Sequence, residues 1–314
     1  MIFSKKITLV YNVINLLKNI FLLSIVFFFC KLVNLQAMQQ SAITAEKHQW
    51  QKSSRTIDLE ARFLREEELI HTVELALTQY KNIQLVNLQD HAVKLAADLP
   101  NQLQVTVVID AFRAFTTAAY VLEQHPNSYR ITTKSEVIAR LASACKHPLL
   151  IGKSERGAAL AYDIPNSPTR VAELSVTGRS VLHRTEAGAK GIFLAQNADI
   201  ILVAGFVNAE ATAEYIRKLV NPKITLAPMG HEATTPSLED HVCALSIATL
   251  INNEKITIEK FIPALRKGSG SYFFSQDQWQ YPHEDFKRCL EMGQPSFAIQ
   301  AIIKKDYAIL RRCQ

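Results

Sequence analysis

Short apolar runs alternate with segments of helical periodicity through most of this 314-residue chain, and this alternation constrains the fold more than any other feature. The strand-like runs are IQLVNL, QVTVVIDAF, YRITT, PLLIGKS, RSVLHRT, DIILVAGF and KITLAPMG. A run that is apolar at nearly every position is typical of a strand buried on both faces of a parallel sheet. The sequence therefore predicts an α/β protein, with a layered α/β/α arrangement and a largely parallel sheet.

Composition agrees with a globular domain and excludes several classes of protein. Apolar residues make up 48% of the chain and charged residues 20%, which permits a sizeable core. The five cysteines form no C-x-x-C pair, so we expect reduced thiols and neither a disulfide framework nor a zinc site. The net charge is +6, and four lysines among the first 37 residues account for +4 of it, which leaves +2. With no basic run interleaved with aromatic residues, we expect no nucleic-acid partner.

The first 37 residues combine basic residues, an apolar run from Ile20 to Cys30, and small residues that end at Ala37. This order is typical of a secretory signal, and the run is short for a membrane span. The segment is thus a signal, an anchor, or an untranslated extension upstream of a start at Met38. We expect a cytoplasmic protein if translation starts near Met38, and an exported or membrane-anchored one otherwise, with the membrane as a partner only in that second case.

Two further divisions follow from the pattern. Residues 38–80 are expected to form a helical extension, since RTIDLEARFLREEELIHTVELALTQY is amphipathic, and its run Glu66–Glu68 is predicted to be a solvated face. Residues 81–314 are expected to form the α/β domain. Within it KGSGSYFF is predicted to be flexible, and the part from Ser275 onward to be a helical closing segment.

In such folds ligands bind beyond the carboxyl ends of the strands, so polar residues at the strand ends are the candidates for a functional site. In IDAFRAFTT, Asp110 ends a strand and can hold a hard cation, while the planar fork of Arg113 suits phosphate or carboxylate. Thr116 and Thr117 follow at a helix start, where backbone N–H groups favour an anion. The alternative is an aspartate helix cap beside a salt-bridged arginine.

A second strand end leads into the polar loop of IGKSERGAALAYDIPNSP. Loops on a rigid scaffold are where sites usually lie. Glu155 and Asp163 could supply oxygen ligands to a metal, and Asn166 and Ser167 could donate hydrogen bonds to phosphate oxygens. The alternative is a turn-rich connection, because Asn-Ser-Pro is common in turns.

A third strand end, LHRTEAGAKG, places Arg184 and Thr185 before a helix entry that contains Gly188. Such an entry beside an arginine favours an anion, although the spacing is not that of a Walker loop. His183 taken alone is more typical of a packed or surface histidine than of a catalytic one.

A fourth strand end, MGHEATTPSLEDHVCA, gathers two histidines and three acidic residues within eleven positions, from His231 to His241. The H-E-x-x-H pattern is absent. Ser237 with Glu239 and Asp240 fits a capping motif with first-turn acids, which is the preferred role for Glu239. A metal-ligand role for Asp240 or Glu239 is the alternative.

These four segments, in this order, resemble those of the 2-phosphosulfolactate phosphatase family, which are magnesium-dependent α/β phosphatases. DAFRA matches the family's D-x-x-R-A, KSERG resembles its G-E-R-x-G, DIPNSP matches its D-x-x-N-S-P, and SLED is similar to its S-L-E-D. The resemblance covers roughly residues 80–300. It departs at HRTEAG, where the family commonly has T-T-T-N-G, and this chain looks like a branch with an R-T-x-A-G segment. The departure leaves the substrate open.

The resemblance implies a magnesium-dependent hydrolase of a small anionic phosphate monoester similar to 2-phosphosulfolactate, with Mg²⁺ as cofactor. The residues expected to be catalytic are Asp110, Arg113 and Glu155. The expected metal ligands are Asp110, Glu155, Asp163 and Asp240. The expected substrate contacts are Arg156, Asn166, Ser167, Arg184 and Thr185. Arginines among these would hold the phosphoryl group and a second anionic group.

Two other interpretations stay open. The altered HRTEAG segment motivates a non-catalytic α/β module that binds a phosphorylated metabolite. An unrelated nucleotide-binding protein is disfavoured because no G-x-G-x-x-G follows a strand. A homodimer is expected from the resemblance.

Overall fold

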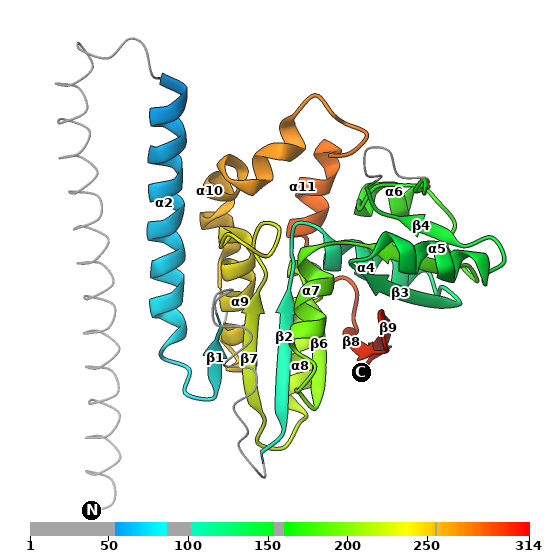
Figure 1. The fold of residues 1–314 in the computed structure, drawn as a ribbon. Coiled ribbons are helices and arrows are strands. Elements are labelled where there is room, and N and C mark those ends of the chain that lie inside the picture. Colours follow the sequence, from blue (N-terminus) through cyan, green and yellow to red (C-terminus); the bar gives the residue numbers. More distant parts are fainter. Residues whose placement is uncertain (1–53, 87–101, 154–159, 255) are drawn as a thin grey trace, which may run out of the picture. The chain divides into compact units, whose positions relative to one another are not determined.

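The computed structural model describes residues 54–86, 102–153, 160–254 and 256–314, with side chains from residue 66 onward (Figure 1). By compactness the chain divides into Met1–Ala61 and Arg62–Gln314. Of the first unit only the helical residues from 54 onward are described, so the predicted segment 1–37 lies outside the described residues. The second unit contains the sheet.

Strands and helices alternate along the described chain much as the sequence predicts. Their bounds are α2 (Ser54–Leu77), β1 (Ile83–Leu85), β2 (Gln104–Ile109), α4 (Ala114–Glu123), β3 (Ser128–Thr132), α5 (Ser135–Ser143), β4 (Leu149–Ile151), α6 (Pro168–Ala172), β5 (Ser180–Arg184), α7 (Ala187–Leu194), β6 (Ile200–Ala204), α8 (Ala209–Arg217), β7 (Lys223–Pro228), α9 (Leu238–Ile251), α10 (Ile262–Lys267), the 3-10 helix η4 (Ser269–Phe274), α11 (His283–Leu290), β8 (Ala298–Ile303) and β9 (Ala308–Cys313). Every strand predicted from an apolar run is present.

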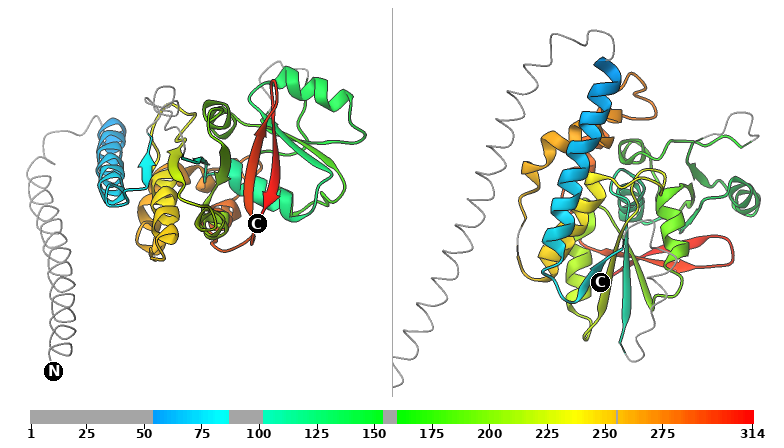
Figure 2. Two further views of the ribbon diagram at one scale, coloured as in Figure 1. Left: turned by 90° about the horizontal axis from the view of Figure 1, so that it is seen from below. Right: turned by 60° about the vertical axis from the view of Figure 1, so that its left-hand side comes forward.

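The described strands form one sheet in the order β1-β7-β2-β6-β8-β9-β3-β5-β4. The first four of these strands are mutually parallel, as are the last three. The antiparallel hairpin of β8 and β9, drawn in red in Figure 2, pairs with β6 on one side and β3 on the other. The predicted α/β class with a largely parallel sheet is therefore confirmed.

The prediction of a helical closing segment from Ser275 onward is wrong beyond α11. The apolar residues of AIQAII and AILRRC pair as strands because they join the two parallel groups of the sheet.

Strand β2 separates two apolar cores. Val108 packs in one cluster with residues of α4 and α7, whereas Val105, Val107 and Ile109 pack in the other with residues of α2, α8 and α9. All four side chains have zero exposure. Because successive strand side chains point to opposite faces, helices cover both faces of the sheet here, which is the predicted layered arrangement.

Helix α2 is integral to one of these cores. Its Ile70, Val73 and Leu77 are buried in the cluster that includes α9. The predicted solvated face is wrong for Glu66, whose Oε1 accepts the N–H of Leu238 at 3.2 Å. This N–H belongs to the first residue of α9, where the N-cap side chain makes no capping hydrogen bond, so Glu66 satisfies a helix-end donor from a distant segment.

None of the helices in the described part of the chain is long and apolar enough to cross a bilayer.

The close contact of α7 with β2 yields a stability prediction at Gly191. A Cβ at this position would lie 2.5 Å from Cγ1 of Val108 and would also meet the sulfur of Met229. Val108 is β-branched and fixed on a central strand, so it cannot move aside. We expect Gly191→Ala to lower the free energy of unfolding by roughly 1–3 kcal/mol, measured by urea denaturation, although alanine gains about 1 kcal/mol in helix propensity.

Lys190→Ala, at the exposed neighbouring position of the same helix, is the matched control and should change the free energy of unfolding by less than about 0.5 kcal/mol. A Gly191→Ala protein as stable as the wild type would contradict the packing described.

Candidate functional site

Asp110 lies directly after β2, at the carboxyl edge of the sheet, with 8% of its surface exposed. Its Oδ1 accepts the N–H of Ala114 at 3.1 Å, and the backbone N–H of Gly188 also donates to the carboxylate. A Cβ at Gly188 would lie 2.9 Å from Oδ2, so the start of α7 approaches this closely only with glycine there. Burial raises the pKa of Asp110 above its ordinary value, opposed by these hydrogen bonds and by the charge of Arg113.

Asp240 joins Asp110 from a distant part of the chain. It lies in the first turn of α9 and is 2% exposed. Its Oδ1 accepts the N–H of Ala111 at 2.8 Å, and its Oδ2 accepts the N–H of Gly230 at 2.7 Å. Burial, and next the charges of Glu239 and Asp110, raise the pKa of Asp240 well above its ordinary value. The fold thus brings two predicted metal ligands together at the ends of β2 and β7.

Glu239 is a third buried carboxyl group in this region. Its Oε2 accepts a hydrogen bond of 2.5 Å from the hydroxyl of Ser269, and burial raises the pKa of Glu239 to about 7. The predicted position in the first turn of the helix is confirmed. Ser237 occupies the predicted N-cap position of α9, but its side chain makes no capping hydrogen bond.

Arg113 immediately precedes α4 and is only 6% exposed. Its Nη1 donates to Oδ2 of Asp285 and to the carbonyl oxygen of Gln280, both at 2.7 Å. The guanidinium also lies over the ring of Tyr281, 4.7 Å from its centroid. Arg113 is therefore held by α11 and by the segment that leads into it.

Asp285 is a residue of this site that the sequence interpretation missed. It has zero exposure, and its Oδ1 accepts the hydroxyl of Ser167 at 2.8 Å and the N–H of Thr169 at 3.0 Å. The signal available in the sequence was weak: Asp285 and Cys289 are four residues apart, so an acid shares the buried face of an otherwise polar helix.

The predicted polar loop is brought to the site only in part. Glu155 and Arg156 lie outside the described residues. Asp163 is exposed, and its Oδ2 accepts the N–H of Leu150 at 2.8 Å. Asn166 is half-buried, and its Oδ1 has no hydrogen-bond partner among the described residues.

The hydroxyl of Ser167 is engaged within the protein. Besides donating to Asp285, it accepts the N–H of Arg170 at 3.2 Å as the N-cap of α6, and the residue has zero exposure.

The described residues contain no group of three or more His, Cys, Asp or Glu side chains arranged to hold a metal ion. Of the predicted ligands, only Asp110 and Asp240 adjoin each other within the described chain. A cation site among the described residues would therefore rest on these two carboxylates, with water as its other ligands.

The third predicted segment lies at the end of β5. Arg184 forms an ion pair with Glu186, and its side chain is 13% exposed. Thr185 is half-buried and donates its N–H to the carbonyl of Thr132 at 3.2 Å. Because α7 begins three residues after Arg184 and its Gly188 contacts Asp110, this segment lies near the carboxylates.

His183 is fully buried, as expected for a packed histidine. Its Nδ1 shares a hydrogen bond of 2.7 Å with the hydroxyl of Tyr129, and its Nε2 has no partner in the described part of the chain. Burial, and secondly the charge of Arg113, lower the pKa of His183 to about 3. The imidazole is therefore neutral at physiological pH.

Thr116 and Thr117 lie in the first turn of α4, as expected, but their side chains are turned into the protein. Both have zero exposure, and the hydroxyl of Thr116 donates to the carbonyl of Ala111 at 2.9 Å. The carboxylate of Asp110 itself is the anion that meets the N-terminus of α4.

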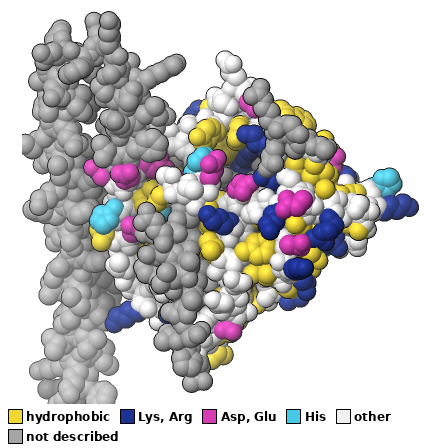
Figure 3. Space-filling view, in the orientation of Figure 1, with side chains coloured by type: hydrophobic (Ala, Val, Ile, Leu, Met, Phe, Trp, Pro, Cys, Tyr) yellow, Lys and Arg dark blue, Asp and Glu magenta, His cyan; other side chains and the backbone are white. Residues whose placement is uncertain are grey.

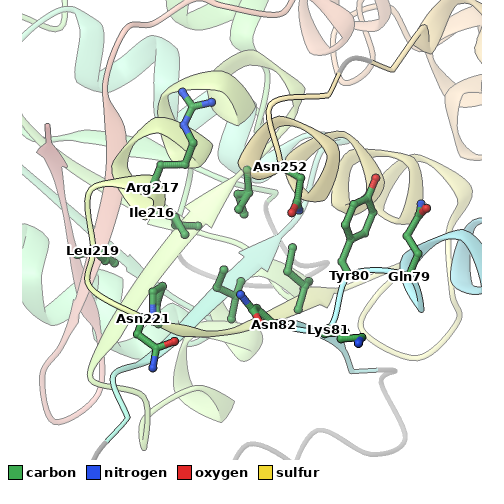
Figure 4. Close-up of a pocket in the computed structure, with 13 residues that line it drawn as sticks. Gln79, Tyr80, Lys81, Asn82, Ile216, Arg217, Leu219, Asn221 and Asn252 are labelled. Atoms are coloured by element: carbon green, nitrogen blue, oxygen red, sulfur yellow. The ribbon is translucent and has the colours of Figure 1, made fainter. Parts of the chain in front are cut away.

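A cavity of about 440 Å³ lies elsewhere on the domain, with Tyr80, Asn82 and Arg217 among the residues that line it (Figure 4). Ile83 and Ile224, near the amino ends of β1 and β7, also line it. Since β1, β7 and β2 are parallel, this cavity lies at the sheet edge opposite Asp110, and it includes none of the predicted site residues.

On the face in Figure 3, acidic and basic side chains are interspersed.

A family model described as 2-phosphosulpholactate phosphatase matches residues 90–291. The chain belongs to this family. The match includes Asp110, Asp240 and Asp285, whereas α2 lies before it. The family membership predicted from the four motifs is confirmed.

Curated relatives in the 2-phosphosulpholactate phosphatase family are moderately similar to this chain. A probable 2-phosphosulfolactate phosphatase of Bacillus subtilis is 27% identical over 205 residues, which cover 64% of this chain and 88% of the relative. One from Deinococcus radiodurans is 32% identical over 147 residues, covering 46% and 60%. One from Parasynechococcus marenigrum is 25% identical over 186 residues, covering 59% and 74%.

The buried His183 gives a prediction about pH and stability. Its pKa of about 3 in the fold is below the ordinary 6.5, so the unfolded chain binds the proton more readily between these values. The contribution of the neutral His183 to the free energy of unfolding is fully present above about pH 6.5 and decreases as the pH falls toward 3. We expect the free energy of unfolding to fall by about 1.4 kcal/mol per pH unit from this group, and His183→Gln to remove that part of the slope.

Urea denaturation at several pH values between 7.5 and 5 measures these slopes. His231→Gln, the same change at an exposed histidine, is the matched control and should keep the wild-type slope. An unchanged slope in His183→Gln would show that the histidine is not held neutral.

Proposed function

We propose that this chain is a magnesium-dependent phosphatase that hydrolyses a small, multiply anionic phosphate monoester of the 2-phosphosulfolactate type. The observation that carries the proposal is the meeting of the buried carboxylates Asp110 and Asp240 beside the guanidinium of Arg113. Carboxylates for a cation and an arginine for an anion are what transfer of a phosphoryl group from a phosphate monoester requires.

The two carboxylates suit a divalent cation. Burial raises the pKa of each, and the mutual charge of the pair raises that of Asp240 further, so a bound cation would favour their ionised forms. Mg²⁺ commonly uses one or two carboxylates, with waters and phosphate oxygens as its other ligands. Each oxygen of Asp240 accepts one backbone N–H and keeps a second lone pair. When bound, Mg²⁺ would neutralise charge on the phosphoryl oxygens.

In this proposal Asp110 and Asp240 hold the cation, with Glu155 as a further proposed ligand. Asp163 is left out because it is exposed and its carboxylate is bonded to the backbone of β4.

Arg113 supports anion binding through those N–H groups of its guanidinium that make no hydrogen bond with the described residues. Its two Nη1 hydrogens are taken by Asp285 and Gln280, while its other three N–H groups make no hydrogen bond with the described residues. These groups would hold the phosphoryl oxygens. Arg156 and Arg184 would hold the second anionic group of the substrate.

Uncharged groups would complete the pocket. Asn166 and Thr185 would orient substrate oxygens or water, and Ser167 would shape the loop, because its hydroxyl is bonded to Asp285 and Arg170. Asp110 is the carboxylate that a phosphoenzyme route would use, whereas direct attack by water would leave it as a metal ligand only.

A second candidate function is a non-catalytic module that binds a phosphorylated metabolite. The segment His183–Gly188, which reads HRTEAG instead of the family's common T-T-T-N-G, favours it. The two functions differ in whether bound phosphoester releases inorganic phosphate.

An assay of phosphate release tests the proposal. With 2-phosphosulfolactate and a panel of small phosphate monoesters, we expect release in the presence of Mg²⁺, loss of release after chelation, and recovery when Mg²⁺ is restored. Asp110→Asn and Asp240→Asn should each lower kcat/KM by on the order of 100-fold or more, because each removes a charge from the cation site. Asp163→Asn should keep kcat/KM within about threefold of the wild type, since a carboxylate outside the site contributes little to transition-state stabilisation.

Full activity in a chelated, metal-free protein would contradict the proposed dependence on magnesium. Binding of the phosphoesters without release, in protein shown to be folded, would favour the non-catalytic module.

A further inference from the structure

We propose that Asp285 is a positioning residue for this reaction, which orients the guanidinium of Arg113 toward the phosphoryl group and keeps it off the carboxylate of Asp110. The inference rests on the proposed function, because it assigns Arg113 to the substrate. Asp285 itself touches no substrate.

The first support is the completeness of the contacts around Asp285. One carboxylate oxygen accepts from Arg113, and the other accepts from Ser167 and from the backbone of Thr169. With zero exposure, this carboxylate has no role at the surface. It joins two other segments of the chain, Arg113 at a separation of 172 residues and Ser167–Thr169 at 116 to 118 residues.

The second support is the competition that Arg113 faces. Arg113 lies three residues after Asp110, and the N–H of Ala114, the residue that follows Arg113, donates to the Asp110 carboxylate at 3.1 Å. A guanidinium without its own carboxylate would be drawn to Asp110 and would occupy the place where a cation must bind. The bond of 2.7 Å to Asp285 gives Arg113 a fixed partner other than Asp110.

The third support is the rigidity of Arg113. Besides the two bonds of Nη1, its guanidinium lies 4.7 Å from the centroid of Tyr281 and 5.6 Å from that of Phe273. A planar donor that is already fixed loses little freedom when it binds an oxyanion. Removal of the Asp285 charge would loosen Arg113 without removing it.

The same carboxylate connects this arginine with the neighbouring loop. Ser167 caps α6 and follows Asn166, which the proposed function places near the substrate. A change at Asp285 would therefore displace both Arg113 and Asn166. We expect its effect on activity to exceed that of breaking an ordinary buried salt bridge.

A double-mutant cycle in the full-length chain tests the inference. Asp285→Asn keeps an oxygen acceptor for Ser167 and Thr169 but removes the charge that holds Arg113. We expect Asp285→Asn and Arg113→Ala each to lower kcat/KM by on the order of 100-fold, and the double variant to be no more than about threefold worse than Arg113→Ala. A positioning residue has no further effect once the residue that it positions is gone.

Asp306→Asn is the matched control, because it breaks the exposed ion pair of Arg140 and Asp306 at 2.6 Å and should leave kcat/KM within about twofold. Thermal unfolding and circular dichroism show which variants are folded. If Asp285→Asn does not fold, Asp285→Glu, which keeps the charge and displaces it by one methylene, takes its place in the cycle with the same criterion.

Losses that multiply in the double variant would overturn the inference, because Asp285 would then act independently of Arg113. If the wild type releases no phosphate, the proposed function fails, and the same four proteins are compared by calorimetric titration with inorganic phosphate. Equal weakening of phosphate binding in Asp285→Asn, Arg113→Ala and the double variant would still support positioning. Phosphate binding of wild-type strength in Asp285→Asn would overturn it.

Discussion

The burial of two carboxylates at one edge of the sheet is the constraint on which the rest of the site depends. Asp110 and Asp240 are removed from water, and like charges in such a place are unfavourable unless backbone donors and a cation compensate them. The backbone supplies N–H groups from four separate places, at Ala111, Ala114, Gly188 and Gly230. The ends of β2 and β7 and the starts of α4, α7 and α9 are thereby fixed around one point.

A second buried pair of ionisable residues, Arg113 and Asp285, lies beside the two carboxylates. Its members carry opposite charges, whereas Asp110 and Asp240 carry like charges. Arg113 and Asp285 neutralise each other, and through Asp285 the start of α6 joins the site. The two arrangements are complementary, since the paired carboxylates suit a cation and the guanidinium presents N–H groups that suit an anion. Charge separation of this kind suits a phosphate monoester bound to a metal.

The sequence predicted those parts of the molecule that local pattern determines. Apolar runs predicted the strands, and the family resemblance placed Asp110 and Asp240 in one set of expected ligands at the strand ends. Asp285 was missed because its partners are 116 to 172 residues away, and nothing within its own helix requires a buried acid. Asp163 was expected at the metal because loop composition does not show which way a carboxylate points.

Tertiary contacts also explain the other differences between the sequence predictions and the structure. The strands β8 and β9 read as helix locally, but their backbone is needed to join the two parallel groups of the sheet. Glu66 lies in an acidic run that looks solvated, yet it completes the start of α9. In each case the sequence period is compatible with more than one structure, and packing against distant segments selects one of them.

A crystal structure of the protein with Mg²⁺ and inorganic phosphate tests the central claim most directly. The account predicts a cation that contacts both Asp110 and Asp240, with a phosphate oxygen on the cation and another on Arg113. A cation bound at Asp163, or a phosphate in the cavity beside Asn82 and Arg217 while the two carboxylates bind nothing, would contradict it.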